Sequence, residues 1–247
     1  MKLFFSSLSL ITMITILFQG NANCDLLKAI QERHAVRQYL PTPIPNETVA
    51  SLTDIIRDIN DKSGLNIQLI TNDSTALSSF LVTYGRFKEA KNYFALVGPN
   101  DEKLLENIGY YGELIVLYCQ SIGLNTCWVG GTYKKNVNRV IVNDGEKFVA
   151  IIAVGYGKDQ GTPHISKPIE ILADGLDDAP KWYIDGVKAA MLGPSALNKQ
   201  NFHFQYKNGK VSILGTSGTY SKIDVGIAKL HFEIGSGKTS EIWQVPL

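Results

Sequence analysis

Hydrophobic positions recur at helical spacing in two long segments of the chain. In the segment 46–59, NETVASLTDIIRDI, one stripe is formed by Val49, Leu52, Ile55, Ile56 and Ile59. Asn46 precedes this stripe and is a residue type that caps helix N-termini. The segment 101–123, DEKLLENIGYYGELIVLYCQSIG, is apolar on most sides, which is typical of a helix buried in the middle of a fold. The pattern predicts one amphipathic helix and one central helix.

Shorter apolar runs are typical of strands. They are KFVAIIAVGYG at 147–157, NFHFQYK at 201–207 and KVSIL at 210–214. The last two runs are separated by Asn208-Gly209, a dipeptide favoured in two-residue hairpin turns. We therefore expect an α+β fold with helices in its interior.

A six-residue motif occurs twice, each time after a predicted amphipathic helix. The segments 54–71, DIIRDINDKSGLNIQLIT, and 186–203, GVKAAMLGPSALNKQNFH, both contain S-x-L-N-x-Q before a strand. The copies are displaced by 132 positions, as from Ser63 to Ser195. Internal similarity at a fixed offset indicates repeated structural units.

A second similarity supports the repeat. The central helix leads to a strand that carries Trp128, and the segment 222–235, KIDVGIAKLHFEIG, leads to EIWQVP with Trp243. We interpret the chain as two related halves, residues 25–175 and 176–247, of which the second is much reduced. The halves are expected to pack within one chain as the two subunits of a dimer would.

Composition and charge narrow the classes of function. The chain has 247 residues, of which 45% are hydrophobic, so it can bury a large core without metal or disulfides. Its 24 basic and 23 acidic residues nearly cancel and form no Lys/Arg run. The charged patch expected of a nucleic-acid-binding protein is therefore missing, and we predict no nucleic-acid partner.

The first residues have a separate character. Lys2 is followed by the apolar run LFFSSLSLITMITILF, and the small residues Gly20 and Ala22 are spaced as for signal peptidase. We interpret residues 1–22 as a removable secretory signal, so we expect an exported protein. The alternatives are a retained membrane anchor, for which the run is shorter than the roughly 20 residues of a spanning helix, and a lipid-modified Cys24. Contact with a membrane is expected only through an uncleaved leader.

Cysteine and histidine give no support for a metal site. The sequence contains three cysteines without a C-x-x-C pair, and its four histidines are scattered along the chain. Zinc sites need closely spaced Cys and His ligands. We predict no structural metal.

Three segments carry candidate chemistry, and the first is QERHAVRQY. Arg33 and Arg37 lie four residues apart at the end of a short predicted helix, DLLKAIQE. Residues four apart project from one helical face, so two guanidiniums there would form a receptor for a phosphate or a carboxylate. The alternative is a solvated pair on the surface.

The other two segments are GLNTCWVGG (123–131) and GPSALNKQNFHF (193–204). Glycines in the first allow the backbone to lie close to a planar ligand, although an ordinary turn beside a core tryptophan would explain them too. The second places Ser195, Asn198 and Gln200 on a turn before a strand. These side chains could contact a ligand or cap the neighbouring backbone.

Taken together, the order R-x-x-x-R, helix, G-L-x-T-C-W, strand V-G-Y and P-S-x-x-N-x-Q resembles the FMN-dependent nitroreductase family. The resemblance spans nearly the whole chain after the leader. In ordinary members P-S-x-x-N-x-Q comes early, and intertwined dimers hold FMN at each interface. Here it comes last, as in a smaller group in which two such units are fused. The resemblance implies a nitroreductase-like α+β fold, with central helices and antiparallel or mixed sheets, that forms a monomeric pseudo-dimer.

The resemblance also implies which residues would bind one FMN per chain. They are Arg33, His34, Ala35 and Arg37 at the phosphate and ribityl chain, Val129, Gly130 and Gly131 along the ring, Lys167 near the phosphate, and Pro194, Ser195, Ala196, Asn198 and Gln200 in the segment that a partner subunit contributes in dimers. The sequence departs from the family pattern at Ala35, at Asn125 and at Asn201-Phe202. These positions usually hold Ser, Gly and Pro-Trp.

The implied reaction is a ping-pong transfer. NAD(P)H would reduce the flavin and leave, and a nitroaromatic compound or a quinone would then be reduced in the same place. No side chain is required as a general acid or base, so we expect no catalytic residue. The departures from the pattern and the export signal leave an alternative, which is a catalytically degenerate protein that binds a flavin or another small ligand on the same scaffold.

Overall fold

The structure of the protein is a computed structural model that describes residues 25–78, 84, 86–134 and 138–244. The predicted leader and Cys24 lie outside these residues. The helices are α2 (Leu26–Glu32), α3 (Asn46–Ser63), α5 (Leu104–Ser121), α6 (Ile169–Leu172), α7 (Lys181–Met191) and α8 (Ser221–Ser236). The strands are β1 (Gln68–Ile70), β2 (Tyr93–Pro99), β3 (Asn125–Val129), β4 (Glu146–Gly155), β5 (Ala173–Asp174), β6 (Phe202–Lys207) and β7 (Lys210–Gly215). Two 3-10 turns, η1 (Ala196–Asn198) and η2 (Ser240–Ile242), complete the set.

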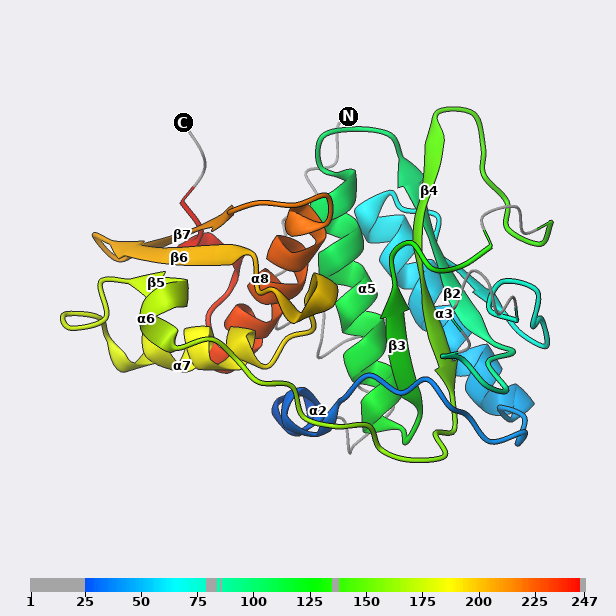
Figure 1. Ribbon diagram of the computed structural model, residues 1–247. Helices are drawn as coiled ribbons and strands as arrows, with labels where there is room; N and C mark the ends of the chain where they lie inside the picture. Colours follow the sequence, from blue (N-terminus) through cyan, green and yellow to red (C-terminus); the bar gives the residue numbers. More distant parts are fainter. Residues whose placement is uncertain (1–24, 79–83, 85, 135–137, 245–247) are drawn as a thin grey trace.

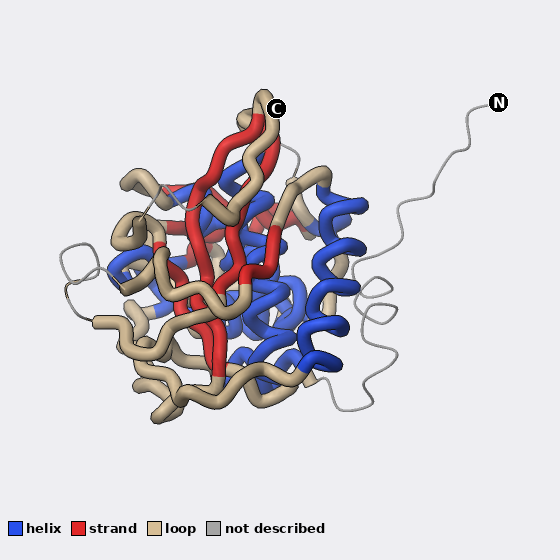
Figure 2. The backbone as a smooth tube through the Cα atoms, turned by 90° about the vertical axis from the view of Figure 1, so that its right-hand side faces the viewer, coloured by secondary structure: helices blue, strands red, loops and turns tan. Residues whose placement is uncertain are grey.

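Two sheets lie at opposite ends of the molecule. The first has the strand order β1-β2-β4-β3 and is antiparallel throughout, and the second has the order β5-β6-β7 with β5 parallel to β6. The helices α5 and α8 pack against each other between the sheets (Figure 1). Figure 2 shows the same arrangement from the side of the four-stranded sheet. These observations confirm an α+β fold with central helices and with one antiparallel and one mixed sheet.

The hydrophobic pattern predicted the two long helices well. On α3 the predicted stripe is buried at Leu52, Ile55, Ile56 and Ile59. The helix begins at Asn46 itself after Pro45, so the predicted cap residue lies inside the helix and makes no capping side-chain hydrogen bond. On α5, 11 of the 18 residues are buried, which confirms its central position.

Strand predictions were correct for three segments and incomplete elsewhere. The hairpin of β6 and β7 turns at Asn208 and Gly209, which both have positive φ, at 52° and 76°. The strand β2, which is buried at every position except Pro99, was not predicted, because its sequence YFALVGP has no polar alternation to distinguish it from a helical run. Near the C-terminus, Glu241 and Ile242 belong to η2, and Trp243 forms a β-bridge with Val211.

The contact between α5 and α8 is reciprocal. A Cβ atom on Gly109 of α5 would clash with the carbonyl oxygen of Ile223, and a Cβ atom on Gly226 of α8 would clash with the carbonyl oxygen of Glu106. In each helix the carbonyl lies three residues before the glycine. The two backbones therefore approach closely at two equivalent points, which is the pattern of a self-complementary interface.

Candidate functional site

A cleft of about 1250 Å³ lies where several distant segments of the chain meet. Its walls come from residues 33–38 after α2, 126–132 of β3 and the following turn, 194–199 around η1, and 217–224 at the start of α8. Ligand sites for small molecules usually span roughly 300 to 1,000 Å³. The cleft is therefore large enough for a nucleotide-sized ligand.

Most of the predicted site residues line this cleft. They are Arg33, His34, Ala35, Arg37, Val129, Gly130, Gly131, Pro194, Ser195, Ala196 and Asn198. Lys167 and Gln200 are not among the lining residues. The tertiary structure thus brings the three motif segments together, and the binding roles of the individual side chains stay predictions.

The two arginines of QERHAVRQY do not share a helical face, which corrects that expectation. Helix α2 ends at Glu32, and Arg33 is its extended C-cap residue, with φ −73° and ψ 127°. Beyond it, Ala35 forms a β-bridge with Thr126. Arg37 is exposed, whereas Arg33 is buried with 7% of its surface accessible. The helix ends here because the backbone after Glu32 pairs with β3.

Arg33 contacts a buried network of polar groups beneath the cleft. Its guanidinium donates to the carbonyl oxygen of Leu192 at 3.3 Å, and its Nε lies 4.0 Å from Oε1 of Glu113. The fully buried Glu113 also accepts hydrogen bonds from Trp128 Nε1 at 2.8 Å and pairs with His231 Nε2 at 2.9 Å. This network joins the end of α2 to α5, β3 and α8 directly beneath the cleft.

The polar side chains of SALNKQ are bonded within the chain. Ser195 Oγ accepts from the Gln200 backbone at 2.9 Å, and Asn198 Nδ2 donates to the Ile165 carbonyl at 2.9 Å. The amide of Gln200 accepts from Lys167 N at 2.7 Å and donates to Met191 O at 2.9 Å. These contacts match the alternative in which the motif caps neighbouring backbone.

The first copy of the motif makes similar contacts. Ser63 Oγ accepts from the Leu65 backbone at 3.1 Å, and both ends of the Gln68 amide bond the backbone of Ile141, at 2.7 and 2.9 Å. In both copies the serine closes the turn and the glutamine fastens it to a neighbouring segment. The repeat therefore has a structural use in both places.

The glycines at the end of β3 have an internal contact as well. A Cβ atom on Gly130 would lie 2.9 Å from the ring of Tyr220, and one on Gly131 would lie 3.1 Å from its hydroxyl oxygen. An aromatic ring of the chain itself therefore lies where the sequence suggested a planar ligand. The departure at Asn125 has no strained backbone, because this residue is extended in β3 and its Oδ1 accepts from Gly157 N at 3.0 Å.

The departures at Asn201 and Phe202 also have clear positions. Asn201 Nδ2 donates to the Ser217 carbonyl at 2.7 Å at the edge of the cleft. Phe202 is 2% exposed and packs in the core beneath the three-stranded sheet. The turn therefore remains closed without the Pro-Trp pair.

Burial is the main cause of the pKa shifts of His34 and Cys127 in the cleft. The pKa of His34 is lowered, first by burial and then by the neighbouring charges of Arg33 and His164. The thiol pKa of Cys127 is raised by burial, so this sulfur is a poor nucleophile. Cys119 and Cys127 are both buried, and neither forms a disulfide with another described residue.

Asp224 on α8 is a lining residue that the sequence did not indicate. It is 2% exposed, and its Oδ1 accepts from Ala196 N at 2.9 Å, while its buried Oδ2 has no hydrogen-bond partner among the described residues. Burial raises its pKa to about 6, against the lowering effect of the Ala196 hydrogen bond. The sequence contained one sign of this residue: Asp224 is a charged residue among the apolar positions of KIDVGIAKLHFEIG.

Three further residues were missed. Arg86 and Tyr220 line the cleft, and Glu113 lies in the network beneath it. Glu113 is a charged residue immediately before the apolar run LIVLYC of its helix, which could have drawn attention to it. Arg86 and Tyr220 lie in segments without a recognisable pattern.

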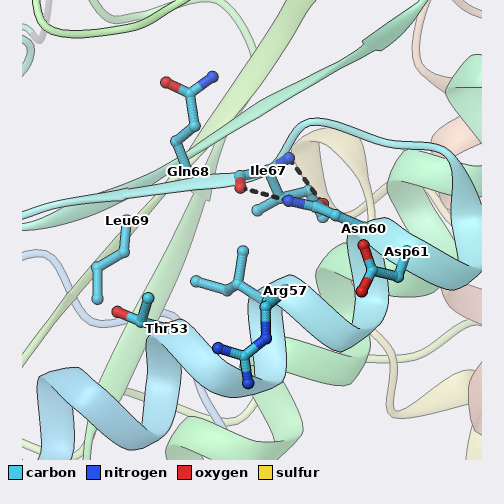
Figure 3. A pocket seen from close by; sticks show the side chains of 8 residues that line it. Thr53, Arg57, Asn60, Asp61, Ile67, Gln68 and Leu69 are labelled. Atoms are coloured by element: carbon cyan, nitrogen blue, oxygen red, sulfur yellow. Dashed lines mark hydrogen bonds between the residues drawn. The ribbon is translucent and has the colours of Figure 1, made fainter.

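A smaller hollow of about 360 Å³ lies between α3 and β1 (Figure 3). Asn60 bonds both the N–H and the C=O of Ile67 across it, each at 2.9 Å. Arg57 at its edge pairs with Asp54 on the same helix at 2.8 Å. No predicted site residue lines this hollow.

Among the residues that the structure describes, no cluster of three or more His, Cys, Asp or Glu side chains could hold a metal ion. No helix among those described is long and apolar enough to cross a membrane.

Comparison with known proteins gives a family for the chain. The family described as "Putative TM nitroreductase" matches residues 25–236. A crystal structure titled "putative nitroreductase", from Thermotoga maritima, has a TM-score of 0.61 at 23% identity, covering 87% of this chain and 85% of that one. At this identity the likeness shows the fold alone. No curated protein matches the sequence.

Other solved structures are more distant. One titled a putative nitroreductase in complex with FMN, from Desulfovibrio desulfuricans, has a TM-score of 0.45 at 16% identity and covers 60% of this chain and 94% of that one. An FMN-dependent nitroreductase from Clostridium difficile has a TM-score of 0.43 at 14% identity, with 53% and 87% coverage.

Proposed function

Because the chain belongs to the TM nitroreductase family, we propose that it is an FMN-dependent oxidoreductase. It would pass reducing equivalents from NAD(P)H to a nitroaromatic compound or a quinone. The observation that best supports this proposal is the convergence of the three motif segments on one cleft. Bound FMN would supply the redox chemistry, while the chain supplies binding, orientation and charge.

The lining of the cleft fits a flavin nucleotide at its charged end. Arg37, Arg86 and Lys199 are its cations, in addition to Arg33, which is paired with Glu113, and its carboxylates are Asp159 and Asp224. Arg37 is exposed and has no ion-pair partner among the described residues. A phosphate monoester forms charge-assisted hydrogen bonds to such guanidiniums. This excess of cations favours an anionic ligand.

The fit to a planar ring needs one rearrangement. The Tyr220 ring lies against Gly130, so a flavin along residues 129–131 requires this side chain to rotate away. Asn198, Gln200 and Lys167 could contact the ligand only after giving up hydrogen bonds that they make within the chain. We propose that Arg37 and the backbone of residues 129–131 provide most of the binding.

We further propose that one chain holds one FMN as a monomeric pseudo-dimer of two fused halves. The reciprocal glycine contacts of α5 and α8 and the matched turns after α3 and α7 support this architecture. Light scattering should give the mass of a single chain, and FMN titration should saturate at one equivalent. Export through the leader stays part of the proposal, and N-terminal sequencing of secreted protein would test it.

The decisive experiment is to load the purified protein with FMN. We expect quenching of flavin fluorescence on binding, followed by flavin bleaching with NADH or NADPH and its return on addition of a naphthoquinone. Arg37→Ala should weaken FMN binding, and Arg57→Ala on α3, an exposed arginine outside the cleft, is the matched control. Protein that stays colourless and refuses FMN would exclude the proposal.

The alternative function is a binding protein without catalysis. It is favoured by Tyr220 lying over Gly130 and by the engagement of Arg33 with Glu113 and Leu192. In this case the protein would bind a flavin or another anionic small molecule, and NAD(P)H would not reduce it. Oxidation of NAD(P)H by the FMN-loaded protein distinguishes the two functions.

A further inference from the structure

Arg86 is a cation of the cleft that no motif of the sequence identifies. It lies shortly before β2, is exposed, and lines the same cleft as Arg37. The backbones of the two stretches are hydrogen-bonded: Lys88 N donates to Arg37 O at 3.1 Å, and Tyr39 N donates to Lys88 O at 3.0 Å. These bonds place Lys88 beside Arg37, and Arg86 lies two residues before Lys88 in the same stretch.

Arg33, the other arginine of QERHAVRQY, is already engaged. Its guanidinium is buried, bonded to the Leu192 carbonyl, and close to the carboxylate of Glu113. Turning it toward a ligand would leave Glu113 buried without this cation, which is costly. A second arginine for a ligand must therefore come from elsewhere in the lining.

Within the described part of the chain, neither Arg37 nor Arg86 forms an ion pair. Because both guanidiniums line one cleft, their like charges repel each other unless an anion binds between them. Each presents a planar fork of N–H donors that matches the oxygens of a phosphate group. We infer that Arg37 and Arg86 together bind a terminal phosphate group of the nucleotide in the cleft. This inference rests on the proposed function, which supplies the nucleotide.

The phosphate has two possible sources. One is the 5′-phosphate of FMN, and the other is the 2′-phosphate of NADPH. Riboflavin and NADH each lack the group in question, so they are matched ligands that leave the rest of the molecule unchanged. Comparing the members of each pair isolates the phosphate contact from every other contact.

The first arm of the test measures dissociation constants for FMN and riboflavin. We expect Arg86→Ala to weaken FMN binding by about 10- to 100-fold, the equivalent of one charge-assisted hydrogen bond to a charged group, and to leave riboflavin binding unchanged. Arg86→Lys keeps the charge but loses the fork, so it should fall between wild type and Arg86→Ala. Arg57→Ala should keep the wild-type preference for FMN.

The second arm measures KM for NADPH and NADH with the FMN-loaded protein. A selective rise in the KM for NADPH in Arg86→Ala, with the FMN preference retained, would assign the clamp to the nicotinamide nucleotide. A loss of the FMN preference alone would assign it to the flavin. Both results support a phosphate clamp and identify its source.

Two outcomes overturn the inference, and they differ in what else they exclude. If wild type prefers FMN over riboflavin and Arg86→Ala keeps both preferences while folding normally by circular dichroism, the inference fails and the proposed function stands. If wild type binds neither flavin, the proposed function fails and the inference fails with it.

Discussion

At the scale of single residues, polar side chains in the turn between α7 and β6 have two possible uses. Ser195, Asn198 and Gln200 bond the backbone of their own chain, although their types are equally suited to a ligand. The same turn contains residues in left-handed backbone conformation, including Leu197 at φ 54° and Asn198 at φ 55°. Such strain is often found next to binding sites.

Leu197 allows this strain to be measured. It is 85% exposed, so its side chain has little packing to lose. The left-handed region costs a non-glycine residue about 1 to 2 kcal/mol, whereas glycine adopts it freely. We expect Leu197→Gly to raise the free energy of unfolding by about 0.5 to 1 kcal/mol in urea titrations, once the extra entropy of glycine in the unfolded chain is subtracted. Leu192→Gly, at φ −85°, should lower it.

Asp224 makes the stability depend on pH. Its ordinary pKa is 3.8, and burial raises it to about 6. The folded chain thus keeps this proton up to about pH 6, while the unfolded chain releases it near pH 4, so this carboxyl lowers stability as pH rises between the two values. We expect Asp224→Asn to be more stable than wild type at pH 8 by up to about 3 kcal/mol.

The pH dependence provides the control for this prediction. The advantage of Asp224→Asn should shrink below pH 6 and vanish near pH 3, where the aspartate is neutral in both states. Urea unfolding at pH 8 and near pH 3 measures both values. Asp61→Asn on the exposed side of α3 should change stability little at either pH, and an equal effect of Asp224→Asn at both would contradict the assignment.

At the scale of elements, the polar network around Glu113 connects pieces that the hydrophobic pattern treats separately. The carboxylate lies in the middle of α5, and the end of α2, the strand β3 and the helix α8 each contribute a partner to it. The same network explains why Arg33 is unavailable to a ligand. One buried carboxylate thereby affects both the packing of the helices and the charge of the cleft.

Removal of Glu113 should therefore be severe. Glu113→Ala leaves the buried Arg33 guanidinium without its carboxylate, and breaking a buried pair in this way costs about 3 to 5 kcal/mol. The free energy of unfolding from chemical denaturation measures this loss. Glu106→Ala removes the half-exposed pair with Lys229 on the neighbouring surface and should cost below about 1 kcal/mol. Similar losses in the two variants would contradict the assigned role of the network.

At the scale of the whole molecule, the packing of α5 on α8 joins the two sheets. Gly109 and Gly226 meet the backbone of the opposite helix at equivalent points. In a true dimer a two-fold axis would make such contacts identical. The same geometry within one chain is what a fusion of two units would produce.

Substitutions at the two glycines test whether α5 and α8 need this close approach. Replacing glycine by alanine inside a helix usually gains up to about 1 kcal/mol. Here we expect Gly109→Ala and Gly226→Ala to be destabilising instead, because each new methyl group would collide with a carbonyl oxygen of the other helix. Thermal unfolding of both variants should show losses of similar size, and Asn107→Ala on α5 is a control outside this contact. A gain in stability in either variant would mean that the helices can separate without cost.

The sequence correctly predicted those elements whose type can be recognised from the hydrophobic spacing within the element itself. Helices α3 and α5, strand β4 and the hairpin of β6 and β7 lie where the pattern placed them. Strand β2 was missed because a strand buried on both faces has no polar alternation. Most of the residues that the motifs identified line the cleft, because the turns that carry these motifs form part of its wall.

Tertiary structure alone decided which side chains are free to bind. Arg33 and Gln200 resemble ligand-binding residues in sequence, yet distant segments occupy their hydrogen-bonding groups. Arg86 and Asp224 acquire their positions in the cleft only when α8, the turn after α7 and the segment before β2 come together. Periodicity along a chain encodes burial, because burial depends on nearest neighbours in the same element. Which groups a polar side chain bonds depends on contacts between different elements, and only the folded structure determines these contacts.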